Sequence, residues 1–129
     1  MDIDGYLSAH ARIRVLLNRL MEALEAAAGV TTLEVYLADI HREMIEHFDH
    51  EEAHGFPAAR SHGWAGGSVV HEFDYHHHLI RRLMEDARAS LHTAPERVLP
   101  LAEELRRRVH EHFETEETAL FPIIEVARR

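Results

Sequence analysis

The chain of 129 residues contains no cysteine and no long hydrophobic run. Without cysteine, neither a disulfide nor a thiolate-ligated metal site can form, which fits a reducing compartment. No segment is long and apolar enough to span a bilayer, and the acidic residues Asp2 and Asp4 argue against a signal peptide. We therefore expect a cytoplasmic protein that does not insert into membranes.

Basic residues are also scarce. The 14 lysine and arginine residues are outnumbered by 23 aspartates and glutamates, which gives a formal net charge of -9 with neutral histidine. Nucleic acids and anionic membrane surfaces select for the opposite charge balance. The composition therefore argues against both kinds of partner.

Strand patterns are missing as well, whereas helical periodicity is clear in four segments. Apolar residues recur there at spacings of three and four, as on helices with one buried face. Gly55 and Pro57 are expected to close the second segment, and the stretch after them is rich in residues typical of loops. We predict one all-α domain over 1–129, an up-down-up-down antiparallel four-helix bundle, with helices at about 4–28, 31–54, 68–91 and 95–121 and a long loop at 55–67.

Histidine is unusually abundant, with 13 copies, and two of them begin a repeated pattern. The pattern His-Phe-x-x-Glu-Glu-x-x-x-Phe-Pro occurs at 47–57 and again at 112–122. Because residues four apart share one face of a helix, each copy presents an imidazole beside a carboxylate. Such pairs on facing helices are how helical bundles hold a two-metal carboxylate centre.

Two further histidines lie at matching heights in the predicted bundle. His10 and His47 are almost equally far from the turn that joins their helices, and so are His77 and His112. At about 1.5 Å of rise per residue, the mismatch is only a few ångströms, so the four histidines can form one layer. The metal ligands predicted from these positions are His10, His47, Glu51, His77, His112 and Glu116.

The third helix leaves one alternative open, because His76, His77 and His78 are adjacent and point about 100° apart. His77 matches His10 when the two halves of the chain are aligned, so we favour His77 and keep His76 as its alternate. Glu52 and Glu117 follow the two predicted ligand glutamates and point sideways, where they can orient ligand imidazoles.

The types of ligand atom also limit which metal can bind. Imidazole and carboxylate without thiolate suit iron or manganese, with zinc as a further alternative. Six protein ligands do not saturate two octahedral ions, which leaves room for an oxo or hydroxo bridge and for an open position. In an apolar pocket, a small molecule such as dioxygen could bind at that open position.

The order His, His-x-x-x-Glu, His, His-x-x-x-Glu resembles the hemerythrin-like, or HHE cation-binding, domains. The residues that fill it are His10, His47 with Glu51, His77, and His112 with Glu116. The resemblance covers nearly the whole chain and implies a non-heme di-iron centre, bridged by the two glutamates and by an oxygen atom from solvent. The invertebrate oxygen carriers have a second helix-three histidine, where this chain offers Phe73 or Arg81. That departure shifts the expectation toward the bacterial relatives.

Three functions follow from this resemblance. The first is binding of dioxygen or a related small oxidant, in oxygen or redox sensing, with a protein redox or signalling partner that the sequence does not identify. The second is a di-iron enzyme that acts on peroxide or nitric oxide. The third is an iron-donating or iron-handling protein.

Overall fold

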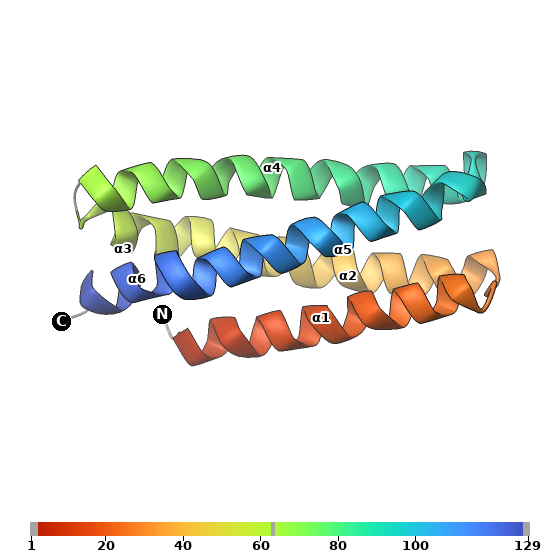
Figure 1. Ribbon diagram of the computed structural model, residues 1–129, viewed down its shortest axis with the longest axis horizontal. Coiled ribbons are helices and arrows are strands. Elements are labelled where there is room, and N and C mark those ends of the chain that lie inside the picture. Colours follow the sequence, from red (N-terminus) through yellow and green to blue (C-terminus); the bar gives the residue numbers. More distant parts are fainter. Residues whose placement is uncertain (1–2, 63, 128–129) are drawn as a thin grey trace.

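The computed structural model describes residues 3–62 and 64–127, with the backbone alone at 64–66 and 127. Four long helices lie side by side and alternate in direction (Figure 1). They are α1 (Ile3–Glu25), α2 (Val30–His50), α4 (Trp64–Thr93) and α5 (Val98–Thr115). Within the described ranges there is no strand. The predicted all-α, up-down-up-down antiparallel four-helix bundle is therefore confirmed.

Around the bundle, α1 packs against α2 and α5, and α4 packs against the same two helices. Five short elements complete the fold. They are the π turn η1 (Glu51–Gly55), α3 (Phe56–Arg60), the 3-10 turn η2 (Pro95–Arg97), the π turn η3 (Glu116–Leu120) and α6 (Phe121–Ala127). The helices α3 and α6 lie at the end of the bundle where α1 begins (Figure 1).

Among the described residues of 55–67, the predicted long loop is not present. Gly55 has helical dihedrals, φ -69° and ψ -49°, and the chain continues directly into α3. Pro57 stands in the first turn of α3, where a missing backbone N–H removes no helical hydrogen bond. Helix α4 then begins at Trp64, four residues before the predicted start. The residues typical of a loop therefore lie in η1, in α3, in a turn at 61–62 and at the start of α4.

Both copies of the repeated motif contain a π turn that begins at the predicted ligand glutamate. The backbone N–H of Phe56 donates to the carbonyl of Glu51, and that of Phe121 donates to the carbonyl of Glu116. A bond that spans five residues widens the helix by one residue, as is frequent at functional sites. Because of this wider turn, the chain stays helical up to the proline, a residue that would interrupt a regular α-helix.

Two apolar clusters fill the interior, with a polar layer between them. On α1, Tyr6 belongs to the smaller cluster near the start of the helix, Ile13 belongs to the larger one, and His10 lies between. The same order recurs on α4 with Phe73, His77 and Ile80. Burial of each large apolar side chain stabilises the fold by about 1.5–3 kcal/mol. The two clusters thereby enclose the polar layer from both ends.

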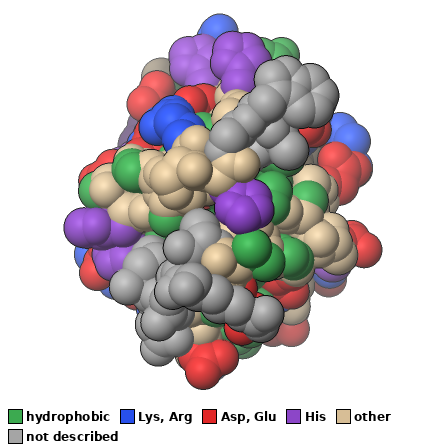
Figure 2. All heavy atoms as spheres, turned by 90° about the vertical axis from the view of Figure 1, so that its left-hand side faces the viewer, with side chains coloured by type: hydrophobic (Ala, Val, Ile, Leu, Met, Phe, Trp, Pro, Cys, Tyr) green, Lys and Arg blue, Asp and Glu red, His purple; other side chains and the backbone are tan. Residues whose placement is uncertain are grey.

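No helix within the described ranges is long and apolar enough to cross a membrane. Figure 2 shows the end of the bundle at which α1 begins, where histidine, acidic, arginine and apolar side chains are mixed. The described side chains visible on that face form no continuous basic surface.

Gly55 provides a test of packing at the first π turn. A Cβ atom added there would lie 2.8 Å from the Tyr6 hydroxyl, and the Tyr6 ring is buried and stacked on Phe121. We predict that Gly55→Ala lowers the free energy of unfolding by about 1–2 kcal/mol in urea denaturation, because overpacking outweighs the gain in helix propensity. Gly67→Ala, where nothing lies within 4 Å, should be neutral or stabilising. Tyr6→Phe should rescue Gly55→Ala; without that rescue, the contact with Tyr6 is not the cause.

Candidate metal centre

All six predicted ligands lie inside the bundle. Their exposed fractions range from 0% to 4%, although each side chain is polar or charged. Each of the four long helices provides one histidine, and each π turn provides one glutamate. Each histidine points inward because it lies on the buried apolar face of its helix.

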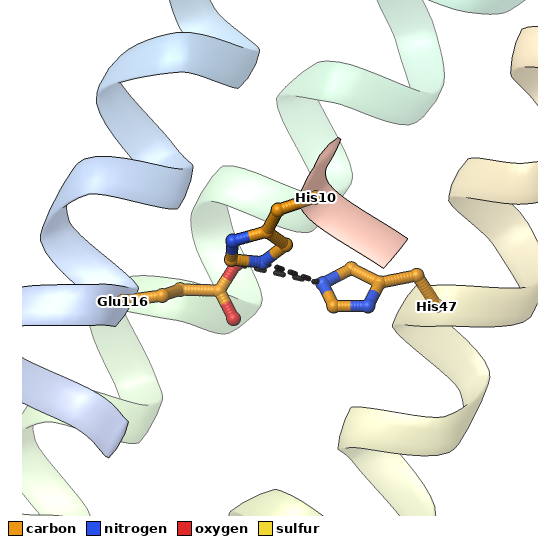
Figure 3. Close-up of side chains that lie close together, drawn as sticks. All are labelled: His10, His47 and Glu116. Atoms are coloured by element: carbon orange, nitrogen blue, oxygen red, sulfur yellow. Dashed lines mark hydrogen bonds and ion pairs between the residues drawn. The ribbon is translucent and has the colours of Figure 1, made fainter. Parts of the chain in front are cut away.

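The six side chains form two groups of three. In the first group, Nε2 of His10 lies 3.1 Å from Nε2 of His47 and 3.5 Å from Oε1 of Glu116. Figure 3 shows these three side chains converging from separate helical segments. All ligand atoms of the group lie within 4.8 Å of one another, so one metal ion could contact all three residues.

The second group repeats this arrangement with Glu51, His77 and His112, and meets the same 4.8 Å limit. Nε2 of His77 lies 3.2 Å from Oε1 of Glu51. The glutamates also connect the groups, because Oε1 of Glu116 lies 2.9 Å from Nε2 of His112 and Oε1 of Glu51 lies 3.4 Å from Nε2 of His47. The glutamates thus lie between the groups, in the position that bridging ligands would require.

The donor atoms at the centre lack partners within the described part of the protein. Both carboxylate oxygens of Glu51 and of Glu116 are buried without a hydrogen bond, and so is Nε2 of His77 and of His112. A buried polar group without a partner destabilises a fold by about 1–3 kcal/mol, and a charged group by more. Metal cations would satisfy all of these atoms at once, so the residues present fit a metal centre.

The outer nitrogen of His10 is held by a carboxylate. Nδ1 of His10 lies 2.8 Å from Oε2 of Glu117, which also accepts a hydrogen bond of 3.0 Å from Arg14. Burial opposes the charge of this carboxylate, but the hydrogen bonds from His10 and Arg14 lower the pKa of Glu117. An anionic Glu117 fixes the proton of His10 on Nδ1 and leaves Nε2 free to bind a cation.

The internal repeat places a similar set around His77. Its Nδ1 lies 3.7 Å from Oε2 of Glu52, and Arg81 donates a hydrogen bond of 2.7 Å to that same oxygen. The contact predicted for Glu117 is therefore present, whereas Nδ1 of His77 lies near Glu52 without a hydrogen bond. Each contact crosses between the halves of the chain, because Glu117 reaches His10 and Glu52 reaches His77.

The phenylalanines of the repeated motif cover two of the imidazoles. The ring of Phe113 stacks on His10, and the ring of Phe48 stacks on His77, each with centroids 3.7 Å apart. Both phenylalanines are fully buried. Stacking restrains each imidazole in one plane and keeps water from its faces.

The structure distinguishes between the two candidate ligands on α4, His76 and His77. His77 is fully buried within the second group, whereas His76 lies outside it and is half-buried. Nδ1 of His76 lies 3.1 Å from Nδ1 of His112, on the side of that ring away from the glutamates. This geometry favours His77 as the helix-three ligand and makes His76 a partner for the outer nitrogen of His112.

Sequence reasoning missed three side chains near the centre: Tyr6, Arg14 and Arg81. The ring of Tyr6 packs edge-on against His47 at 5.5 Å between centroids, and its hydroxyl lies 3.3 Å from Nδ1 of His50. Burial and the Glu116 carboxylate raise the pKa of Tyr6, so it remains a neutral phenol. The available signal was the spacing of four residues before or after a predicted ligand histidine on the same helix.

A comparison with protein families agrees with this geometry. The model of the hemerythrin HHE cation binding domain matches residues 1–124. No curated protein and no solved structure matches the chain.

The imidazoles of the second group are held neutral. Burial lowers the pKa of His77 to about 2, and the nearby Arg81 guanidinium adds to the shift. Burial also holds the pKa of His112 well below its usual value. Neutral imidazoles are the form that binds metal, so no proton has to leave these rings at neutral pH.

We predict a pH-dependent stability of the metal-free protein from these shifts. Below about pH 6.5 the unfolded chain protonates both histidines and the native state does not, so the free energy of unfolding falls as pH falls. Each histidine contributes a slope of up to about 1.4 kcal/mol per pH unit. Urea denaturation between pH 7 and pH 5 measures the slope, and His77→Leu should reduce it. An unchanged slope in that variant would contradict the assignment of a neutral, buried His77.

Proposed function

The chain belongs to the hemerythrin HHE cation-binding domain family, and from this premise we propose that it is a non-heme di-iron protein that binds dioxygen or a related small oxidant. The observation that carries the proposal is the pair of buried histidine and glutamate groups. Their donor atoms have no partners of their own among the described residues. Two carboxylates in a closed interior offset part of the charge that two cations would bring.

In this proposal one iron ion is held by His10, His47 and Glu116. The other is held by the second group, which consists of Glu51, His77 and His112. Each glutamate lies close enough to the other group to bridge the ions. Manganese and zinc could use the same donors. When bound in its reduced state, iron supplies electrons and an open coordination position to a small oxidant.

The surrounding residues would orient the ligands and exclude water. Glu117 holds the outer nitrogen of His10, which directs Nε2 of that ring inward, and Glu52 lies 3.7 Å from the outer nitrogen of His77. The stacked rings of Phe48 and Phe113 close the centre on the side of the larger apolar cluster.

Metal analysis and an absorption spectrum of freshly purified protein test the proposal directly. We expect about two iron ions per chain and near-ultraviolet charge-transfer bands of a bridged di-ferric centre. Stopped-flow mixing of the reduced protein with dioxygen, peroxide or nitric oxide then separates the functions. A stable adduct supports binding, whereas consumption over many turnovers identifies an enzyme. Rapid transfer of iron to a chelator identifies an iron donor.

The two glutamates offer the sharpest mutational test. We predict that Glu51→Ala and Glu116→Ala each lose at least one metal ion and lower the melting temperature of the loaded protein, because a bridging ligand contacts both ions. Metal content by elemental analysis and thermal unfolding measure these effects. His62→Ala is the matched control, because His62 is exposed and should leave the metal content unchanged. Full metal retention in both glutamate variants would exclude the bridging role.

A further inference from the structure

The internal repeat creates two related grooves that lead to the centre from opposite sides. The first lies between α1 and α2, has a volume of about 400 Å³ and ends at His47. The second lies between α4 and α5, has a volume of about 230 Å³ and ends at His112. The first groove is the larger, and Ala9 lines it at the position of the repeat where His76 lines the second.

Only two of the four histidines line a groove, and the one in the first groove is less restrained than the one in the second. Nδ1 of His112 has the contact with Nδ1 of His76 described above. Within the described residues, Nδ1 of His47 has no hydrogen-bond or ion-pair partner. That nitrogen points away from His10 and Glu116 (Figure 3), and the His47 residue is only 4% exposed. An imidazole that lies beside a groove and whose outer nitrogen has no partner can turn without breaking a second contact.

Metal exchange requires such freedom, because all six ligands are closed off from solvent. A hydrated cation can reach the centre only if one ligand moves aside and later returns. His10 and His77 line neither groove, and His112 would have to break its contact with His76. His47 has no comparable contact to break.

We propose that the groove between α1 and α2 is the route by which a divalent cation enters and leaves the centre, with His47 as the ligand that turns to admit it. The inference rests on the proposed function as a metal-binding protein. Glu43, Glu46 and His50 line the groove and offer oxygen and nitrogen donors that suit iron and manganese.

Charge alone does not select this route. Each groove is lined by two glutamates and one arginine, with Arg12 paired to Glu43 in the first and Arg108 paired to Glu104 in the second. Two of the differences between the grooves bear on metal access. His76 occupies the second groove and contacts His112, and His50 of the first groove is replaced by Thr115 in the second.

The test places in the first groove a histidine equivalent to His76, which occupies the second groove. Metal uptake by the metal-free protein is followed with Co²⁺ by stopped-flow absorption. Ala9→His should slow Co²⁺ uptake at least tenfold, because its imidazole fills the first groove and contacts His47. The final ratio of two ions per chain should not change. Ala11→His is the matched control, with the same substitution on an exposed face of α1, and should take up Co²⁺ at the wild-type rate.

A second substitution makes the test reciprocal. Adding His76→Ala to Ala9→His opens the second groove and should restore most of the uptake rate. If circular dichroism shows that Ala9→His does not fold, Ala9→Leu fills the same space with an apolar side chain and carries the same expectation. Full loading at the wild-type rate in the blocked variant would overturn the route. Uptake of fewer than two ions by the wild-type protein would instead contradict the proposed function itself.

Discussion

The structure depends on the burial of two glutamates, Glu51 and Glu116, between four imidazoles. Carboxylate oxygens without hydrogen bonds in a closed interior destabilise a fold unless cations compensate them. Apolar clusters on both sides keep water from supplying that compensation. A cation that balances this layer would therefore stabilise the bundle, which would couple its stability to metal binding.

The internal repeat explains how a short chain builds such a layer. Each group of three combines two histidines from one half with a glutamate from the other. The outer contacts also cross between the halves, from Glu117 to His10 and from Glu52 to His77. Neither half can complete a group alone, so the two helical hairpins must dock before either group forms. The centre thereby joins the halves as well as offering a site for a ligand.

Much of this arrangement could be predicted from spacing, because a helix fixes which residues share a face. The equal distances of paired histidines from their turns predicted one layer of four histidines. The separation of four residues in His47–Glu51 predicted a glutamate one turn further along on the same face. The π turns could not be predicted in the same way. Gly55 and Pro57 are strong signals for the end of a helix, and only the change to a five-residue hydrogen bond lets the helical path continue. The choice between His76 and His77 likewise depended on helix rotation, which local spacing does not determine.

Departures from the repeat distinguish the two sides of the centre. A fully symmetric pair of halves would give both groups the same surroundings and the same access. Instead, Tyr6 stands where the second half has Phe73, and Ala9 stands where it has His76. The first replacement brings a neutral hydroxyl close to the His47 side, and the second leaves that side open. Because the ligands themselves are matched, any difference in behaviour between the two groups must arise from these neighbouring residues. The repeat thus builds the two groups of histidines and glutamates, and its exceptions give the two groups different surroundings.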